Sequence, residues 1–304
     1  MIDLITGIHH ITAMANDAVA NNTFYTQSLG QRRVKKTVNF DAPDVYHLYY
    51  ADRVGTPGSI MTYFPFPDIG RARRGCGEVG HIAYAVPEKA LKEWARRYRG
   101  ARRDTLFGEE RLHLTGPDGE AILLVGSDET AFQPLAQAMD LAIVPRGFHS
   151  ASLRVAEAEG MDALLRLMGY VREETQGSVT RYRVAGKRAS VIDLNIRPDM
   201  PLATRGAGSV HHIAFAVPDR AAQVSVREAL LAAGYEVTPV IDRSYFHAIY
   251  FRAPGGILFE IATDEPGFAI DEPVETLGEA LLLPPRHEGL RAKLERSLPS
   301  LGSV

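Results

Sequence analysis

Four short segments of the chain alternate apolar and polar positions, and each carries a histidine near its start. These histidines are His10 in HHITAMA, His81 in GHIAYAV, His149 in FHSASLRV and His212 in HHIAFAV, and their numbers differ by 71, 68 and 63. Alternation of this kind places every second side chain on one face of a β-strand. The segments therefore predict the first strand of a unit that is repeated four times.

The residues after each such strand predict a helix and then further strands. In HIAYAVPEKA and HIAFAVPDRA the strand ends at a Val-Pro step, because proline cannot donate a hydrogen bond to a sheet. Helices are predicted at 90–98 and 221–233, the second ending at Gly234. Strands are predicted at 245–252 and 257–262, separated by the turn Ala-Pro-Gly-Gly. The unit is thus predicted to be β-α-β-β-β.

Composition narrows the classes of protein that remain. Among 304 residues, 34 Lys and Arg face 37 Asp and Glu, a formal charge of −3 that argues against a nucleic-acid partner. No stretch approaches the roughly 18 apolar residues of a membrane span. The single Cys76 fits a reducing compartment, and the first residues lack the basic start of a signal peptide. We expect a cytoplasmic protein without membrane partners.

Several segments, taken in order, are similar to one known family: GIHHITAMA, VYHLYYADRVGTPGSIMTYFP, RGFHSASLRV, VIDL, HHIAFAVPD and DRSYFHAIYFRAPGGILFE. The chain resembles the vicinal oxygen chelate superfamily (glyoxalase, bleomycin resistance and extradiol dioxygenase proteins) from Gly7 to about Glu272. Within it, the likeness is closest to ring-cleaving dioxygenases of hydroquinone and chlorohydroquinone. The resemblance implies an α+β fold in which βαβββ modules pair into two open barrels around a divalent metal.

With about 150 residues per domain, the length suggests two domains. We expect modules 1 and 2 to form the first, over residues 1–135. Modules 3 and 4 would form the second, over residues 136–304, which ends in a C-terminal helix.

One carboxylate in the fourth module is chemically conspicuous. Glu260 lies in the otherwise apolar strand GGILFEIAT, where burial is costly unless the charge is paired or coordinated. An ion pair with Arg252 or Arg243 would satisfy it. Coordination would instead need two imidazoles on adjacent strands, the 2-His-1-carboxylate face that leaves open positions on Fe(II). His212, which shares its strand face with small alanines, is the first candidate.

The second imidazole depends on which modules pair. If modules 3 and 4 form the metal barrel, the set is His149, His212 and Glu260. If modules 1 and 4 pair, as the resemblance implies, it is His10, His212 and Glu260. Both of these modules begin with a His-His doublet, which favours His10. The same ligands accept Fe(II) and Mn(II), and Fe(II) is expected.

The resemblance also implies a group of residues around the metal. His9 and His211 precede the ligands and by strict alternation would face away, although a bulge can break that rule. In the resembling subfamily the matching positions surround the metal ligands, together with those that fall here on Thr12, Arg243 and Tyr250. Arg243 would stabilise an anionic oxygen, and Tyr250 would donate a proton or a hydrogen bond.

A second His-His-carboxylate set remains to be placed. His81, His149 and Asp193 occupy similar places in modules 2 and 3. We interpret them as a structural trace of duplication. Leu123 is expected to hold the position of Glu260 in module 2.

The function predicted on these grounds is an Fe(II) dioxygenase that opens a small aromatic diol with O2. A glyoxalase-type isomerase and a non-catalytic binding protein are the alternatives. Isomerases of this superfamily commonly present two carboxylates. In module 1, the residue six positions after Pro57, as Glu260 lies six positions after Pro254, is Tyr63 and not a carboxylate. Pocket size is expected to depend on Phe40, Tyr46, Phe246 and Phe251. A homo-oligomer is left open.

Overall fold

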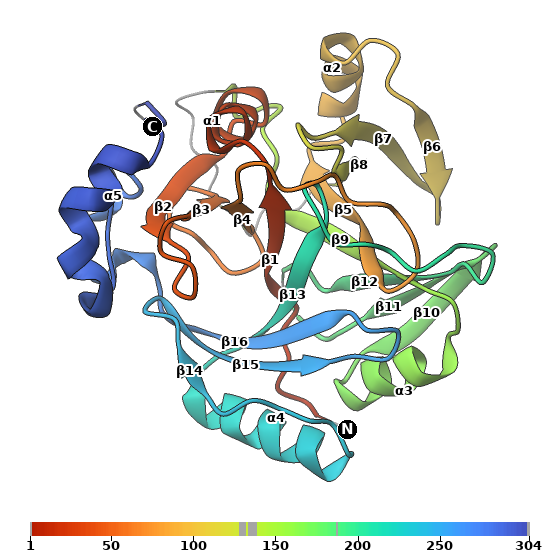
Figure 1. The fold of residues 1–304 in the computed structure, drawn as a ribbon. Helices are drawn as coiled ribbons and strands as arrows, with labels where there is room; N and C mark the ends of the chain where they lie inside the picture. The colour runs from red at the N-terminus through yellow and green to blue at the C-terminus, as the bar shows by residue number, and fades with distance from the viewer. Residues whose placement is uncertain (1, 128–131, 133–138, 187, 303–304) are drawn as a thin grey trace.

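In the computed structural model the chain forms four modules, each with a strand, a helix and three further strands (Figure 1). The structure describes residues 2–127, 132, 139–186 and 188–302. Module 1 comprises β1 (Ile8–Ala15), α1 (Ala18–Thr23) with a π-helical turn (Phe24–Ser28), β2 (Arg32–Val38), β3 (Tyr46–Ala51) and β4 (Ile60–Pro65). Module 2 comprises β5 (Glu78–Val86), α2 (Ala90–Arg97), β6 (Arg103–Leu106), β7 (Glu109–Thr115) and β8 (Ala121–Gly126).

Modules 3 and 4 repeat this order. Module 3 comprises β9 (Phe148–Val155), α3 (Glu159–Leu167), β10 (Val171–Gln176), β11 (Val179–Arg183) and β12 (Val191–Ile196). Module 4 comprises β13 (Val210–Val217), α4 (Arg220–Ala232), β14 (Ile241–Asp242), β15 (Phe246–Arg252) and β16 (Leu258–Pro266). Three short 3₁₀ turns (Phe268–Ile270, Val274–Thr276 and Pro285–Leu290) lead to the C-terminal helix α5 (Arg291–Ser297). The predicted βαβββ unit and the C-terminal helix are confirmed.

The sixteen strands found among the described residues form two curled eight-stranded sheets. The first has the order β14-β15-β16-β13-β1-β4-β3-β2, and the second β10-β11-β12-β9-β5-β8-β7-β6. The centre of each sheet is an antiparallel pair, β1 with β13 and β5 with β9, and each of these strands has a parallel neighbour on its other side. Modules 1 and 4 therefore build one half-barrel, and modules 2 and 3 the other.

The expected division at residues 135 and 136 does not coincide with the division between the two sheets. It placed modules 1 and 2 together, but strands from both sides of that boundary share each sheet. The chain crosses from the first sheet to the second after β4 and returns after β12. The two crossing segments pair with each other through isolated bridges, Arg71 with Ala207, Arg73 with Thr204 and Cys76 with Leu202. This pairing holds the two half-barrels side by side.

Alternation along each strand sorts apolar from polar side chains. In β13, Ile213, Phe215 and Val217 are fully buried on one face, and small alanines occupy the other. The main core contains the apolar faces of both sheets, so the two half-barrels share it. α4 covers the outside of β15 and β16 (Figure 1), and the buried Gln223 amide donates to the carbonyls of His247 and Ile261. The other face of each sheet is left to line a cavity.

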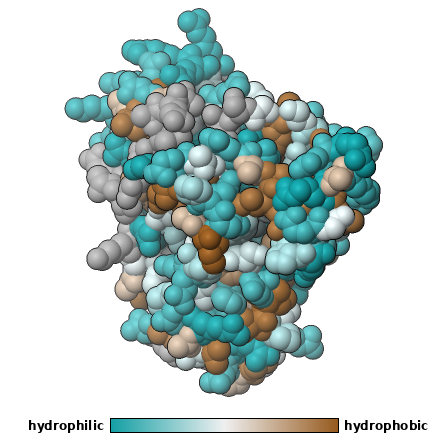
Figure 2. Space-filling view, turned by 90° about the vertical axis from the view of Figure 1, so that its left-hand side faces the viewer, coloured by the Kyte–Doolittle hydropathy of each residue, from teal (hydrophilic) through white to brown (hydrophobic). Residues whose placement is uncertain are grey.

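No helix among the described residues is long and apolar enough to cross a membrane. Figure 2 shows one face on which hydrophobic residues form scattered small groups among hydrophilic ones.

A buried lysine connects the first sheet to the segment after β16. The Lys35 ammonium is fully buried and lies 2.6 Å from both Asp271 Oδ1 and Glu272 Oε2. Glu272 is itself buried, and it also accepts hydrogen bonds from the backbone N–H groups of Gly278 and Ala280. This pair therefore fixes the path of the chain from module 4 towards α5.

We predict that Lys35→Met destabilises the fold by about 3–5 kcal/mol, because it leaves the buried Glu272 carboxylate without its cation. Chemical denaturation measures this. The matched control is Lys293→Met, which removes an ion pair of the same 2.6 Å length between exposed side chains and should cost less than about 1 kcal/mol. Equal losses in the two variants would contradict the prediction, whereas adding Glu272→Gln to Lys35→Met should recover part of the stability.

Candidate metal centre

Three adjacent strands bring His10, His212 and Glu260 together at the centre of the first sheet. His10 is on β1, His212 on β13 and Glu260 on β16, and Ala214 of β13 lies opposite both His10 and Glu260 in the register. Glu260 Oε2 lies 3.0 Å from His212 Nε2 and 3.4 Å from His10 Nε2, and the two Nε2 atoms are 3.3 Å apart. All three residues are buried. The structure thus brings together the set expected from pairing modules 1 and 4.

The donor atoms fit a metal ion. Bonds from a metal to imidazole nitrogen or carboxylate oxygen are about 2.0–2.2 Å long, so two ligands at right angles lie about 3 Å apart, close to the three observed separations. Neither Glu260 oxygen accepts a well-directed hydrogen bond from a described residue, although the side chain is completely buried. A buried carboxylate without such partners needs another positive charge. Among the described residues, no other group of three His, Cys, Asp or Glu side chains is arranged to hold a metal.

The charge states also suit coordination. Burial alone would raise the pKa of Glu260, but His10 and His212 outweigh it and hold that pKa well below its usual range. Burial lowers the pKa of His212, and Glu260 offsets this only in part. Metal ligands must be neutral imidazoles and ionised carboxylates. The pKa shifts of Glu260 and His212 are therefore in the direction that a divalent cation requires of its ligands.

Two β-bulges explain why both residues of each histidine doublet reach the site. In the pairing of β1 with β13, the register shifts between Ile8 and His10, and again between Thr12 and Ala13. The first shift leaves His9 as an extra residue in β1. The second leaves His211 as an extra residue in β13, between Val210 and His212. Each bulge breaks the alternation that would turn the first histidine away.

The first histidine of each doublet holds the ring of the second. His9 Nδ1 lies 2.9 Å from His10 Nδ1, and His211 Nδ1 lies 2.8 Å from His212 Nδ1. An imidazole can present a free Nε2 lone pair only if its proton is on Nδ1. His10 and His212 would then donate to His9 and His211. Burial lowers the pKa of both acceptor rings to about 3, which keeps them neutral.

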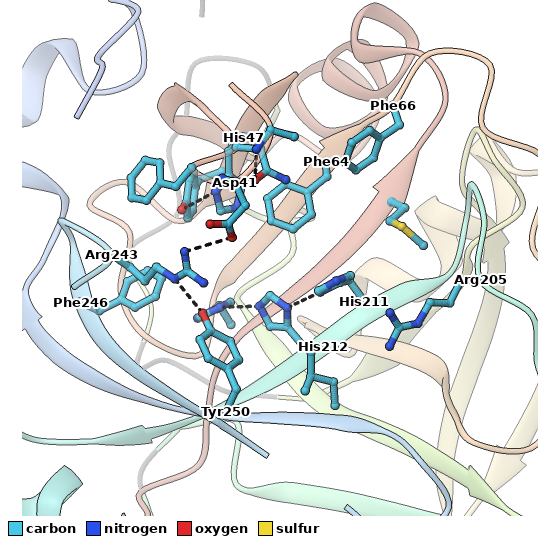
Figure 3. Close-up of a pocket in the computed structure, with 17 residues that line it drawn as sticks. Asp41, His47, Phe64, Phe66, Arg205, His211, His212, Arg243, Phe246 and Tyr250 are labelled. Atoms are coloured by element: carbon cyan, nitrogen blue, oxygen red, sulfur yellow. Dashed lines mark hydrogen bonds and ion pairs between the residues drawn. The ribbon is translucent and has the colours of Figure 1, made fainter. Parts of the chain in front are cut away.

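A cavity of about 460 Å³ opens above these histidines (Figure 3). Aromatic side chains form its walls, with ring centroids of His47 4.0 Å from Tyr49 and 4.4 Å from Phe64. The lining residues are His10, Met14, Asn39, Phe40, Asp41, Ala42, His47, Tyr49, Phe64, Phe66, Arg205, His211, His212, Arg243, Phe246, Tyr250 and Leu258. The cavity is suited to a flat apolar ring with a few polar substituents.

Arg243 and Tyr250 lie together on one wall of this cavity. Arg243 Nε donates to the Tyr250 hydroxyl at 3.1 Å, and Arg243 Nη1 lies 3.5 Å from the exposed Asp41 carboxylate (Figure 3). Tyr250 is paired with Glu260 in the register of β15 and β16, and burial raises the pKa of its hydroxyl well above the ordinary value. Neither Arg243 nor Arg252 forms an ion pair with Glu260, so the alternative ion-pair reading of Glu260 is not supported.

A hydrogen-bonded chain runs beside the centre, and sequence reasoning found only its first member. Thr12 does not line the cavity; its hydroxyl lies 2.8 Å from that of Thr62. Thr62 Oγ1 lies 2.8 Å from His47 Nε2, and His47 Nδ1 lies 2.8 Å from the Tyr49 hydroxyl. His47 and Tyr49 both face the cavity. The sequence feature that could have identified His47 and Tyr49 is the alternation in VYHLYY, which places both side chains on one face of the strand.

The strand register relates modules 1 and 4 position by position. Thr12 is paired with Thr62, as Ala214 is paired with Glu260. Thr62 is therefore the counterpart of Glu260 in module 1, and the predicted counterpart Tyr63 is wrong by one residue. The shift matters because neighbouring residues face opposite sides of a sheet.

The second sheet lacks the metal set. Aligning β9 on β13, strands of eight residues with matching buried positions, places Ser150 at His212 and His149 at His211. His149 Nε2 is bound to Glu109 Oε1 at 3.0 Å. A ligand set of His149, His212 and Glu260 would thus have to join two different sheets. The choice of His149 is not supported by the geometry.

Asp193 occupies in the second sheet the position that Glu260 occupies in the first. Each carboxylate residue is paired with a residue of the neighbouring central strand. Arg181, in the place of Tyr250, binds both oxygens of Asp193, at 2.8 Å and 3.0 Å. The interpretation of His81, His149 and Asp193 as a trace of duplication therefore agrees with this geometry, and Leu123 does occupy the position expected of it, opposite Ala83.

Of the four aromatic residues expected to set pocket size, two line the cavity. Phe40 and Phe246 do so, whereas Tyr46 and Phe251 are buried in the main core. Their strand faces decide this outcome, and those faces could not be assigned from the sequence.

Comparison with known proteins agrees with this architecture. Residues 155–261 match the profile of the Glyoxalase/Bleomycin resistance protein/Dioxygenase superfamily. MhqO of Bacillus subtilis (strain 168), provisionally named a ring-cleaving dioxygenase, is 41% identical, with 96% of this chain and 95% of MhqO covered. The chlorohydroquinone/hydroquinone 1,2-dioxygenase of Sphingobium indicum is 33% identical, with 97% and 96% covered.

Solved structures show the same fold. A provisionally named dioxygenase from Bacillus subtilis superposes with a TM-score of 0.93 at 38% identity, covering 99% of this chain and 100% of that one. Glyoxalase I from Zea mays reaches 0.61 at 14% identity, covering 85% and 92%, and shows similarity of fold alone. With full-length relatives above 30% identity, the chain belongs to the glyoxalase/bleomycin resistance protein/dioxygenase superfamily, as a homologue of its ring-cleaving dioxygenases.

Proposed function

We propose that the protein is a metal-dependent dioxygenase that opens the ring of a hydroquinone or substituted hydroquinone with O2. His10, His212 and Glu260 would hold Fe(II), with Mn(II) as the alternative ion. The observation that carries the proposal is the triangle of two imidazole nitrogens and one carboxylate oxygen, with edges of 3.0–3.4 Å, at the floor of an aromatic cavity. The names of the relatives add the reaction and the substrate class.

The chain's own residues would bind and orient the ring. Phe246 packs against the rings of His9 and His10 with centroids 5.2 Å and 4.9 Å away, and so forms a flat wall next to the floor. A bound metal would lower the pKa of a substrate hydroxyl and offer open positions for substrate and O2. Water would be excluded by the apolar walls, which strengthens the remaining electrostatic contacts.

Arg243 and Tyr250 would act on the substrate oxygens. The Tyr250 hydroxyl accepts a hydrogen bond from Arg243 Nε, so its own proton is free to be donated into the cavity. Its raised pKa keeps that proton in place. The Arg243 guanidinium would stabilise negative charge that develops on oxygen.

His9, His211 and Thr12 would position other groups. With a metal bound at Nε2 of His10 and His212, His9 and His211 would accept from their Nδ1–H groups and so fix their orientation, as outer partners of metal ligands commonly do. Thr12 would act through Thr62 and His47, since its hydroxyl does not reach the cavity.

The isomerase alternative finds no support at the matching position of module 1. Thr62 stands there in the register, and its hydroxyl is engaged by Thr12 and His47. A hydroxyl cannot supply the second carboxylate that such an isomerase would use as a base. The dioxygenase proposal is therefore kept alone.

We predict that His10→Ala, His212→Ala and Glu260→Ala each lower the affinity for Fe(II) by more than about 100-fold, since losing even an outer partner of a metal ligand costs 10–100-fold. Metal titration of the purified variants, with circular dichroism as a check of folding, measures this. His149→Ala is the matched control and should retain the wild-type affinity. Loss of metal from His149→Ala and its retention in His10→Ala would exclude the proposed centre.

We predict that kcat/KM for hydroquinone exceeds that for catechol by at least about tenfold. The basis is the likeness to hydroquinone dioxygenases, and the panel should include methylhydroquinone and chlorohydroquinone. Oxygen consumption after anaerobic loading with Fe(II) measures it. Equal or faster turnover of catechol would contradict the para preference and leave the broader ring-cleaving activity.

We predict that Arg243→Ala and Tyr250→Phe lower turnover by about 10²–10⁴ while iron content stays near the wild-type value, as expected for the loss of one charge-stabilising or proton-donating group. Tyr250→Phe removes only a hydroxyl, so a folding defect is not expected. Tyr46→Phe is the matched control, because its hydroxyl donates to the Pro299 carbonyl outside the cavity. A loss below about threefold in both variants would show that they are scaffold residues.

A further inference from the structure

The second half-barrel, formed by modules 2 and 3, encloses a cavity of its own. Its volume is about 220 Å³, and it lies on the sheet face that corresponds to the metal centre of the first half-barrel. The lining residues are His81, Ala83, Arg102, Leu106, Arg111, His113, Leu123, Ser150, Ser152, Arg154, Val179, Asp193, Asn195 and Arg197. Four arginines thus share this wall with one carboxylate. Nothing in the proposed dioxygenase chemistry uses this cavity.

At positions matched to the first half-barrel, the second half-barrel has an additional cation and a neutralised carboxylate. The alignment of β9 on β13 puts Arg154 at Ala216, a small residue in the first half-barrel. Gly80, at the place of His9, provides the room, because a Cβ there would lie 2.8–2.9 Å from the Arg154 guanidinium. The carboxylate at the Glu260 position, Asp193, is neutralised by Arg181. The cavity therefore favours anionic over cationic ligands.

Hydrogen-bond donors remain unused in this cavity. Arg154 is only 8% exposed; one nitrogen, Nη1, binds Glu78, but its Nε has no partner among the described residues. The His81 ring makes no hydrogen bond with a described residue. Asn195 accepts from Ser178 through Oδ1, which leaves its NH2 group for the cavity. The buried Arg154 guanidinium, together with the partly exposed His81 ring and Asn195 amide, is therefore suited to an oxyanion.

The nearby carboxylates are already shared among several cations. Asp104 forms ion pairs with Arg102, Arg111 and His113. Glu78 forms ion pairs with both Arg154 and Arg74. Burial lowers the pKa of the Arg154 guanidinium, and Glu78 offsets this only in part. An additional anion would therefore reduce the free-energy cost of burying the Arg154 charge.

The shape and chemistry of the wall indicate an organic anion. Among the lining residues, Ala83 and Leu123 belong to a small buried apolar cluster, and Leu106 and Val179 are further apolar residues of the wall. The volume equals that of about seven water molecules at roughly 30 Å³ each, more than phosphate or chloride would fill. Guanidinium groups bind carboxylates through two parallel hydrogen bonds.

We propose that this cavity of the second half-barrel binds a small organic carboxylate with a short hydrocarbon body. Its carboxylate accepts from Arg154 and Asn195, and its hydrocarbon part contacts Ala83 and Leu123. The site is separate from the candidate metal centre, which lies in the other sheet, and does not depend on the activity proposed for that centre.

Calorimetric titration of the full-length protein with succinate tests this proposal. We expect one site per chain, with a dissociation constant below about 1 mM. Asn195→Leu removes the amide donor at nearly constant volume, and Arg154→Gln removes the charge; each should weaken binding at least about tenfold. Asn195→Leu keeps the test valid if Arg154→Gln fails to fold. The matched control is Arg183→Gln, which removes an exposed arginine paired with Glu173 on the same sheet and should bind succinate normally.

Two further titrations test where succinate binds and which class of anion the site accepts. Glu260→Gln should bind succinate as the wild type does, because the metal centre is not involved; loss of binding in this variant would overturn the proposal. Inorganic phosphate should bind at least about tenfold more weakly than succinate, and equal binding would refute the organic class. Absence of succinate binding up to about 10 mM, a level at which a −3 kcal/mol site would be occupied, would show that the arginines serve only the packing of this half-barrel.

Discussion

The antiparallel pairing of β1 with β13 is the constraint on which the candidate site depends. This pair joins the first module to the last, so that His10 and His212, 202 residues apart in the chain, face each other across two hydrogen-bonded strands. β16 then lies parallel to β13 and adds Glu260. The precision of the site follows from sheet geometry, because neighbouring strands are about 4.8 Å apart and their side chains stand on one face. Loops contribute the rim, whereas strands place the three donor atoms.

The same pairing accounts for the histidine doublets. Each of β1 and β13 has one extra residue, and the bulges let His9 and His211 turn towards the site instead of into the core. A bulge costs regular hydrogen bonding in the sheet, and such features recur beside functional sites. Here each one adds an acceptor for the Nδ1 atom of a neighbouring imidazole. In the proposed metal centre, the doublet would therefore supply both a donor for the metal and the group that orients it.

Much of the fold was readable from alternation, but the partners of the strands were not. Period-two patterns assign each side chain to a face, and this was enough to find the βαβββ unit. The choice of His10 beside His212 and Glu260 rested on the family resemblance and on the His-His doublets. Which module pairs with which depends on long-range hydrogen bonds, such as those between the two crossing segments 71–76 and 202–207. For this reason the expected boundary at residue 135 does not separate the two sheets, although the His-His doublets had already pointed to modules 1 and 4.

Errors of a single residue arose where positions were counted from turns. Pro57 and Pro254 occupy turns of different composition, so counting six residues onward gave Tyr63 instead of Thr62. The face of every residue in a strand depends on such a count. His47 and Tyr49 were missed for a related reason, since their role becomes visible only when Thr62, which connects Thr12 to His47, is placed on the cavity side.

Duplication explains how one architecture can carry two unlike cavities. The first sheet has Tyr250 opposite Glu260, and the second has Arg181 opposite Asp193. A phenol leaves the carboxylate free for a cation, whereas a guanidinium occupies both of its oxygens. A metal ion would have to displace that bidentate pair and would find Ser150 in the place of His212, so these two differences together make the second half-barrel unsuited to a metal. The sheet itself need not change, since Arg181 is held by the same register that holds Tyr250.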